Sequence, residues 1–211
     1  MQNFETLKDY KLSLGVIFLL FISSITVDLS AQSWTFVKSE EGINLFTRKE
    51  EGSSLKSFKG IMDVNSTMDK VCNLIGNVKN HDWWDENLRE IKVLSYEKDK
   101  YFQYYLVYHV PWPFTDRDLC VEANVNTDPI TGRRTITATP LTNVIPEKPD
   151  LIRIKKYWQK WTIQPMENGV IRLTLEGFVD PAGNIPSWLY NMVIIETPLK
   201  VMRRVKKYVQ K

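Results

Sequence analysis

The chain has 211 residues, of which 43% are hydrophobic and 25% are charged, and its formal net charge is +3 at pH 7. This length suits one domain with a sizeable core, and so small a positive charge gives no reason to expect nucleic acid as a partner. The two histidines and two cysteines have no spacing typical of a metal site, and no cofactor is expected.

The chain begins with a segment typical of an export signal. An uncharged run from Leu12 to Val27 follows two lysines, and it is shorter than the about 20 apolar residues that a membrane-spanning helix needs. Cleavage is expected after Ala31. The sequence therefore predicts a signal peptide over 1–31, a single domain over 32–211 and a periplasmic or secreted location. An uncleaved N-terminal anchor is the alternative.

The first part of the remaining chain predicts a hairpin and a helix. Strands are expected at 43–48 and 55–64, with turn residues between them. Asn-Ser-Thr at 65–67 is suited to begin a helix whose apolar face includes Cys72. The other cysteine, Cys120, is expected in a strand. A disulfide and two buried free thiols both remain open.

From residue 91 the pattern changes to antiparallel strands. They are expected at 91–97, 101–109, 119–126, 133–139, 152–164 and 170–179. Apolar and polar residues alternate strictly in the last strand, which puts Glu176 on its outward side. Asn168-Gly169 before that strand is a strong hairpin signal.

The chain ends in an amphipathic helix that is expected to begin at Pro186. Pro198 should kink this helix. Its apolar stripe recurs every three or four residues, at Trp188, Met192, Ile195, Leu199, Met202 and Val205. A hairpin, a helix, a long antiparallel run and a terminal helix indicate an α+β fold in which a curved antiparallel sheet wraps around the C-terminal helix.

Large aromatic side chains are frequent, with 7 Trp, 9 Tyr and 9 Phe. If the helix does not fill the curved sheet, an apolar cavity remains, and such a cavity binds an apolar ligand. The alternative is that these side chains pack a solid core.

Several segments resemble motifs of StAR-related lipid-transfer (START) domains. Pro-Trp-Pro at 111–113 and Arg-Asp at 117–118 are similar to a motif between two central strands of that family. Trp84-Asp85, Trp161 and the segment DPAGNIPSWLYN at 180–191 are similar to further motifs in the family's order. The resemblance implies a helix-grip fold that encloses an apolar tunnel for one lipid, with the C-terminal helix as its lid.

The resemblance and the aromatic pattern give one set of candidate ligand-binding residues, namely Trp84, Tyr104, Tyr108, Trp112, Arg117, Trp161, Trp188, Met192 and Ile195. Tyr104 and Ala123 align where sterol-binding members carry an ionic pair, so the sequence does not support a sterol ligand. Arg117 is either a clamp or ion pair at a strand start with Asp118, or a ligand for a lipid phosphate or carboxylate.

The last helix also carries basic residues that could contact an anionic membrane surface transiently, namely Lys200, Arg203, Arg204, Lys206 and Lys207. A solvated helix end is the alternative reading, because cations are favoured there by the helix dipole. The helix is expected to open as a lid at a membrane, with Gly183 and Pro198 as hinges.

The expected function is non-catalytic binding of one hydrophobic ligand, with or without its transfer, and the expected partner is a lipid or another hydrophobic small molecule. A helix-grip enzyme of the cyclase or dehydratase type is the main alternative. It needs an acid or base that faces the cavity, and the candidates are His109, Asp116, Asp118 and Glu176. A solid-cored interaction module is a third possibility. The ligand and the oligomeric state are not identified by the sequence.

Overall fold

The structure, a computed structural model, describes residues 33–81, 83–84 and 87–210. These residues form a ten-stranded sheet in the order β1-β2-β3-β10-β9-β7-β6-β5-β4, with β8 beside β6. The strands are β1 Thr35–Glu40, β2 Ile43–Lys49, β3 Lys56–Asn65, β4 Leu88–Glu97, β5 Tyr101–Tyr108, β6 Arg117–Thr127, β7 Arg134–Pro140, β8 Ile152–Arg153, β9 Tyr157–Pro165 and β10 Val170–Val179.

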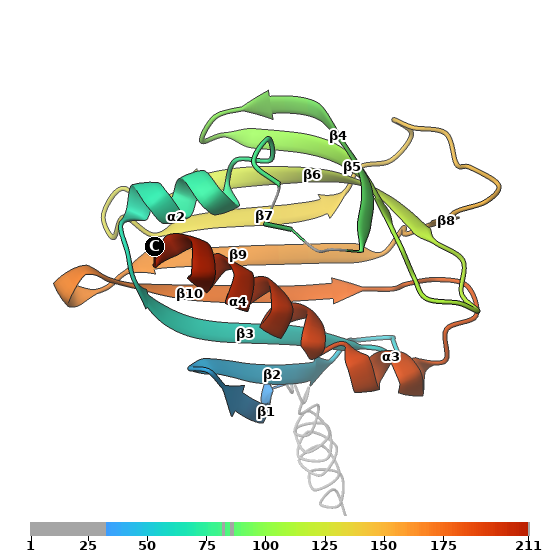
Figure 1. Cartoon of the computed structure of the whole chain (residues 1–211), viewed down its shortest axis with the longest axis horizontal. Coiled ribbons are helices and arrows are strands. Elements are labelled where there is room, and N and C mark those ends of the chain that lie inside the picture. Colours follow the sequence, from blue (N-terminus) through green and yellow to red (C-terminus); the bar gives the residue numbers. More distant parts are fainter. Residues whose placement is uncertain (1–32, 82, 85–86, 211) are drawn as a thin grey trace, which may run out of the picture. The chain divides into compact units, whose positions relative to one another are not determined.

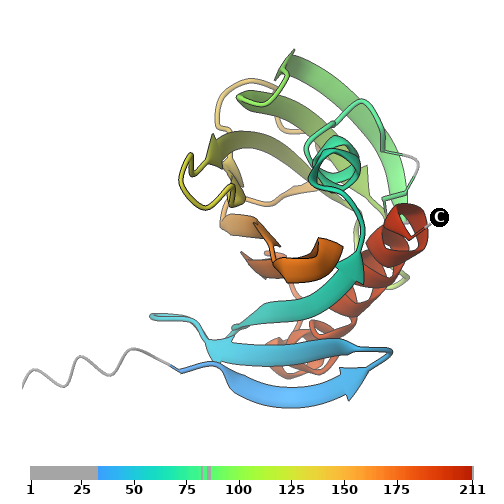
Figure 2. The ribbon, with the colours of Figure 1, turned by 90° about the vertical axis from the view of Figure 1, so that its left-hand side faces the viewer.

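Three helices accompany the sheet in the described part of the chain, α2 Met68–Ile75, α3 Ser187–Val193 and α4 Glu196–Val209. The sheet curves around α4, which lies along its concave side (Figures 1 and 2). The edge strands β1 and β4 do not pair with each other, so the sheet is not closed. This arrangement confirms the predicted α+β helix-grip class. None of the described helices is long and apolar enough to cross a lipid bilayer.

Tight turns join the antiparallel strands where residues that tolerate positive φ are available. Asn168 (φ 57°) and Gly169 (φ 71°) connect β9 to β10, as predicted from their sequence. The first hairpin, β1–β2, was not predicted. It turns at Glu41 (φ 53°) and Gly42 (φ 79°) and adds an edge strand before residue 43. Thr67 caps α2 by accepting a hydrogen bond from the Lys70 N–H at 3.3 Å.

The predicted strand over 152–164 is two strands. β8 pairs with β6 in parallel, whereas β9 lies between β7 and β10. The reason is the side chain of Arg153, which reaches both carboxylate oxygens of Asp118 at 2.8 Å. The Ile154 N–H also donates to the Asp118 carbonyl at 2.9 Å. These bonds hold the segment against β6 before the chain enters the sheet as β9.

The predicted single C-terminal helix is also two elements, because α3 ends at Val193 and α4 begins at Glu196. Pro198 has no N–H to donate to the Ile194 carbonyl, and its ring would clash with that carbonyl in a continuous helix. The N–H of Thr197 instead donates to Ile194 at 3.3 Å. The break rotates α3 away from the predicted apolar stripe, which continues in α4 alone.

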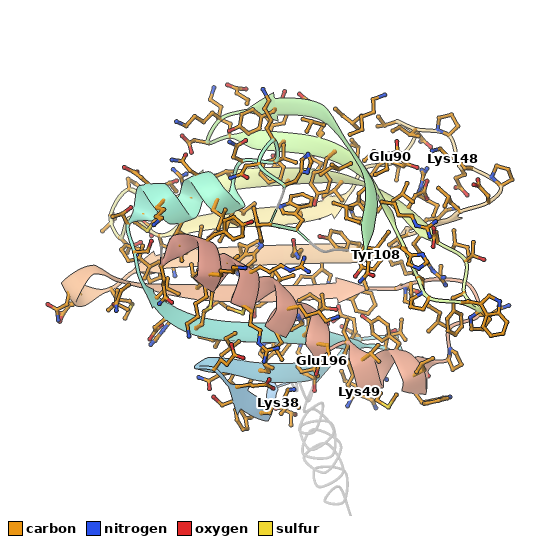
Figure 3. The ribbon with its side chains drawn as sticks, in the orientation of Figure 1. Lys38, Lys49, Glu90, Tyr108, Lys148 and Glu196 are labelled. Carbon is orange, nitrogen blue, oxygen red and sulfur yellow. The ribbon has the colours of Figure 1, made fainter. Side chains whose placement is uncertain are left out.

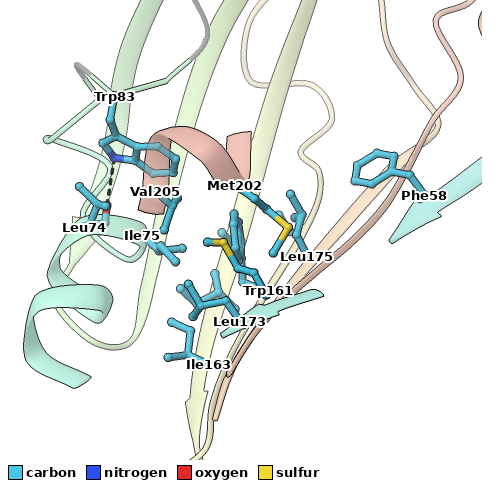
Figure 4. Close-up of a cluster of buried hydrophobic side chains, with 14 of the residues drawn as sticks. Phe58, Leu74, Ile75, Trp83, Trp161, Ile163, Leu173, Leu175, Met202 and Val205 are labelled. Carbon is cyan, nitrogen blue, oxygen red and sulfur yellow. Dashed lines mark hydrogen bonds between the residues drawn. The ribbon is translucent and has the colours of Figure 1, made fainter. Parts of the chain in front are cut away.

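The core lies on the concave side of the sheet beneath α4. Met202 and Val205 of α4 are fully buried and pack with Leu173 and Leu175 of β10 in one cluster (Figure 4). A Cβ atom at Gly60 would lie 2.3 Å from the Met202 sulfur, so glycine lets α4 approach the sheet closely. In the same cluster the indole N–H of Trp83 donates to the Leu74 carbonyl at 3.2 Å.

The two cysteines lie in different hydrophobic clusters and are both free and buried. Cys72 belongs to the concave core. Cys120 packs with Tyr105 and Val107 in a second, smaller cluster that is covered by part of the segment before β9. Because Cys120 alternates with the inward-facing Leu119 and Val121 along β6, the sheet separates the two thiols. The disulfide alternative is therefore not the arrangement of this structure.

Candidate functional site

The concave face beside residues 83–84 gathers aromatic side chains from separate elements. Alternation along β5 turns Phe102 and Tyr104 inward, and both are 5% exposed. The ring of Tyr104 contacts Trp84 edge to face, with a centroid distance of 5.2 Å, and stacks on Phe102 at 6.1 Å. Trp161 of β9 is buried in the same cluster. The predicted residues Trp84, Tyr104 and Trp161 thus lie on one face.

A pair of buried hydroxyls adds polarity to this face. The phenols of Tyr104 and Tyr157 influence each other's ionisation, and burial raises the pKa of both well above the ordinary value. Burial raises the pKa of the Tyr157 phenol, and yet the residue is only half-buried. Leu106 on the same face of β5 is likewise only half-buried. Half-buried residues on the inward face of the sheet indicate that the core does not cover this face completely.

Two further donors near this face lack an acceptor. The indole N–H of Trp84 and the hydroxyl of Tyr190 are buried without a hydrogen-bond partner among the described residues. Burial raises the pKa of the Tyr190 phenol, and a backbone group of Val179 offsets that rise only in part. Val179 pairs with Tyr157 across β9 and β10. The donors therefore run from the loop at Trp84 through the tyrosine pair to α3.

A cavity of about 450 Å³ adjoins Trp84 and opens to the surface. Its apolar side is lined by Trp83, Trp84, Leu88 and Ile91, and the last turns of α4 contribute Arg204 and Lys207. This volume is within the usual range for small-molecule pockets. The cavity lies beside the C-terminal end of α4.

Arg117 is 2% exposed and points inward from the first position of β6. Its guanidinium donates to the carbonyls of Pro181 at 3.1 Å and Ala182 at 3.2 Å, and also to Thr115. Burial lowers the pKa of this guanidinium. Arg117 therefore clamps the turn before α3. It is not paired with Asp118, because successive residues of a strand point to opposite faces.

The candidate acids and bases of the enzyme alternative are all engaged away from the aromatic face. His109 Nδ1 lies 2.9 Å from Asp116, which also pairs with Arg89. Burial opposes ionisation of Asp116, but the Val110 N–H, His109 and Arg89 lower its pKa overall. Asp118 holds Arg153 on the outer side. Glu176 pairs with Lys59 at 3.0 Å on the outward side that the sequence predicted.

Three predicted ligand-binding residues lie at the surface. Trp112 is 91% exposed, Trp188 is 67% exposed and Met192 is 62% exposed. They belong to the β5–β6 connection and to α3, which adjoin because Arg117 bonds both Thr115 and the turn at 181–182. None of the three lines the concave face in this structure, and a role in binding ligand stays a prediction for them.

The remaining predicted ligand-binding residues lie nearer the interior. Ile195 is 9% exposed and packs in the core. Tyr108 is half-buried at the end of β5, and the side-chain amide of Asn87 donates to its hydroxyl at 3.4 Å (Figure 3). Both therefore stay compatible with contact to a ligand on the concave side.

The basic residues of α4 divide into two groups. Arg203 pairs with Glu40 and Glu41, and Lys206 donates to the Glu41 carbonyl at 2.7 Å. At the start of the helix Glu196 pairs with Lys38 at 3.1 Å (Figure 3). Arg204 donates to the Trp84 carbonyl. Lys200 and Lys207 are exposed. The first group fastens α4 to the β1–β2 hairpin.

Two residues of the site, Tyr157 and Tyr190, were not predicted from the sequence. Tyr157 lies four residues before Trp161 on the same face of β9, so strand alternation could have found it. Tyr190 is the buried residue of α3, and the stripe at 188 and 192 hid it because that stripe assumes one continuous helix.

Known proteins are similar to this chain over most of its length. The chain is 29% identical over 182 residues to an uncharacterised protein of Pseudomonas aeruginosa, covering 86% of this chain and 89% of that one. It is 26% identical over 171 residues to the mouse phosphatidylcholine transfer protein, covering 77% of each. The structure of a STAR-related lipid transfer protein fragment from Xanthomonas axonopodis superimposes with a TM-score of 0.76 at 25% identity, covering 84% of this chain and 99% of that one.

The family-level match extends over the same region as the fold and reaches into the N-terminal segment. The sequence model of the START domain matches residues 23–211. That range includes every strand and helix described above and all the motifs that suggested the resemblance. The chain belongs to the START domain family.

Proposed function

We propose that this chain binds a single hydrophobic ligand, a lipid, on the concave face beneath α3 and α4, and transfers it between membranes. The observation that carries the proposal is the aromatic face around Tyr104, where inward-facing residues are only half-buried and buried donors lack acceptors. Membership of a family with lipid-transfer relatives supports it.

The proposed role is non-catalytic. General acid or base chemistry needs a titratable group that faces the substrate, and His109, Asp116, Asp118 and Glu176 are held by partners elsewhere. The phenols on the concave face have pKa values raised by burial, which makes them poor bases at neutral pH.

The segment that opens is α3 with the turn before it, while α4 stays in place. Tyr190 is the one buried residue of α3, and Asn191 ties this helix to the turn at 54–56 through two hydrogen bonds. By contrast, α4 buries five residues and is fastened to the β1–β2 hairpin. Weakly packed elements open at the lowest free energy.

The membrane contact of this carrier is the exposed apolar surface formed by Trp112, Trp188, Met192 and Val193, here called the tryptophan surface. Apolar surface of this kind is typical of interaction sites, and it adjoins the opening segment. Lys200 and Lys207 add attraction to anionic lipids. The leader at 1–31 directs export, with cleavage after Ala31.

Native mass spectrometry of the full chain, expressed with its own leader in a bacterial host, tests these proposals in one experiment. The intact mass is expected to correspond to a chain that begins at Gln32, with one lipid per chain that is lost on denaturation. Lipid identification after extraction names the ligand. A ligand-free mass that persists after incubation with mixed-lipid vesicles would sink the carrier proposal, and a chain that retains its leader would sink the proposed cleavage after Ala31 alone.

A further inference from the structure

The buried donors of the concave face outnumber the acceptors around them. The indole N–H of Trp84 has no acceptor among the described residues. The hydroxyls of Tyr104 and Tyr157 influence each other's ionisation on this face, where burial raises the pKa of both phenols, and even a bond between them would use one O–H and leave the other to donate. Because the ring of Trp84 lies against Tyr104, the two spare donors belong to one small region.

A buried donor without an acceptor has lost its hydrogen bond to water and forms no other. Such donors destabilise the protein when no ligand is bound. Trp Nε1 can only donate, so another side chain or ligand must bring an acceptor to complete this site. On the concave side the surrounding side chains are apolar or aromatic, including Phe102, Leu106 and Trp161. Polar side chains, among them His81 and Glu90, line the open cavity that Trp84 also borders. None of the described residues supplies an acceptor to the Trp84 N–H, and a molecule that enters the concave side would supply one.

Of the basic groups near this region, Arg117 and Arg204 have partners, and Lys207 is exposed to solvent at the open cavity beside Trp84. The fork of Arg117 is occupied by three backbone carbonyls, and Arg204 donates to the Trp84 carbonyl. Burying an anion without a free cation beside it is costly. A cation is disfavoured for a different reason, because the polar atoms offered here are donors and present the positive ends of their dipoles.

We infer that the ligand presents an uncharged oxygen, of an ester, ketone or alcohol, to the Trp84 indole N–H and to the spare hydroxyl of the Tyr104–Tyr157 pair. This inference rests on the proposed function and specifies the class of lipid. The oxygen accepts hydrogen bonds from these donors, while the hydrocarbon chain of the lipid lies against the apolar residues of the concave side.

A competition experiment with matched probes tests the assignment. The full chain is incubated with methyl oleate, oleyl alcohol, oleate and 1-heptadecene in equal amounts, and the bound species are counted by native mass spectrometry. One hydrogen bond to a buried donor corresponds to about a tenfold preference for methyl oleate or oleyl alcohol over the hydrocarbon. The ratio of ester to alcohol distinguishes a carbonyl from a hydroxyl acceptor.

Two variants locate the oxygen. Tyr104→Phe and Trp84→Phe are each expected to reduce the preference for the oxygenated probes about fivefold to tenfold and to leave hydrocarbon binding unchanged. Tyr105→Phe is the matched control, because it removes the same atom one residue along β5, where the hydroxyl donates to Asp118 at 3.2 Å on the outer face. This variant should keep the full preference.

The outcomes separate the two proposals. Equal binding of 1-heptadecene and methyl oleate, or tighter binding of oleate than of its methyl ester, would overturn the uncharged-oxygen assignment while lipid binding stands. A loss of preference in Tyr105→Phe equal to that in Tyr104→Phe would overturn it as well. If none of the four probes binds, the proposed carrier function itself fails.

Discussion

Asp118 and Arg117 show how one dipeptide serves two sides of a sheet. Arg117 points inward and holds the turn before α3, whereas Asp118 points outward and holds Arg153, with side chains only 1% and 9% exposed. The hydroxyl of Tyr105 adds a third partner for this carboxylate. A motif that suggested ligand contact thus has a structural function on both faces.

Replacement of Asp118 by Asn is expected to destabilise the fold by about 3 kcal/mol or more, because Arg153 would remain buried without a counter-ion. Urea denaturation of the full chain measures this loss. Asp63→Asn is the matched control, since Asp63 makes the same two-bond contact with Arg172 at the surface and exposed pairs contribute about 1 kcal/mol or less. Similar losses in both variants would contradict the asymmetry.

At the scale of elements, the sequence predicted most strands because alternation and turn residues act locally. The boundaries 170–179 of β10 and the hairpin at Asn168-Gly169 agree with the structure. The errors came from long-range contacts. The pairing of Arg153 with Asp118 divides the strand predicted over 152–164. The two residues are 35 positions apart, so the alternation of apolar and polar residues within the strand does not reveal their contact.

The candidate site was predicted only in part for the same reason. Tyr104 and Trp161, which the aromatic pattern and the family resemblance suggested, lie on the concave face. Helical periodicity failed at Trp188 and Met192 because the chain breaks at Ile194, four residues before Pro198, and the rotation of α3 at that break depends on tertiary packing.

The division of the C-terminal region into a loosely packed α3 and a fastened α4 makes a prediction about exchange. Asn191→Ala removes the bonds to the Lys56 N–H at 2.8 Å and the Ser54 carbonyl at 2.9 Å. A loss of about 1 kcal/mol from the closed state should raise the rate of fluorescent-lipid transfer between vesicles about fivefold. Arg203→Ala, which loosens α4 from Glu40 and Glu41, should leave this rate nearly unchanged. Faster transfer in Arg203→Ala alone would show that α4 is the moving lid.

At the scale of the whole molecule, exposed apolar and exposed basic residues belong to different elements. The tryptophan surface is formed by α3 and the β5–β6 connection, next to the turn that Arg117 clamps. Lys200 and Lys207 are on α4. Apolar insertion and charge attraction respond differently to lipid composition and salt, so the two contributions can be measured separately.

The double variant Trp112→Ala with Trp188→Ala should weaken binding to phosphatidylcholine vesicles at least about tenfold, with or without phosphatidylglycerol, because burial of each large aromatic ring stabilises the bound state by about 1.5–3 kcal/mol. Lys200→Glu with Lys207→Glu should weaken binding only to the vesicles with phosphatidylglycerol, and only at low salt. Vesicle flotation measures both.

Ile130→Ala is the control for non-specific adhesion, because Ile130 is 93% exposed. It lies in the β6–β7 turn, at the opposite end of β6 from Arg117 and therefore away from the tryptophan surface. This variant should bind all vesicles as the unchanged chain does. If it loses as much binding as the double tryptophan variant, exposed apolar residues act without regard to position. The tryptophan surface would then have no special part in bringing the opening segment to the membrane.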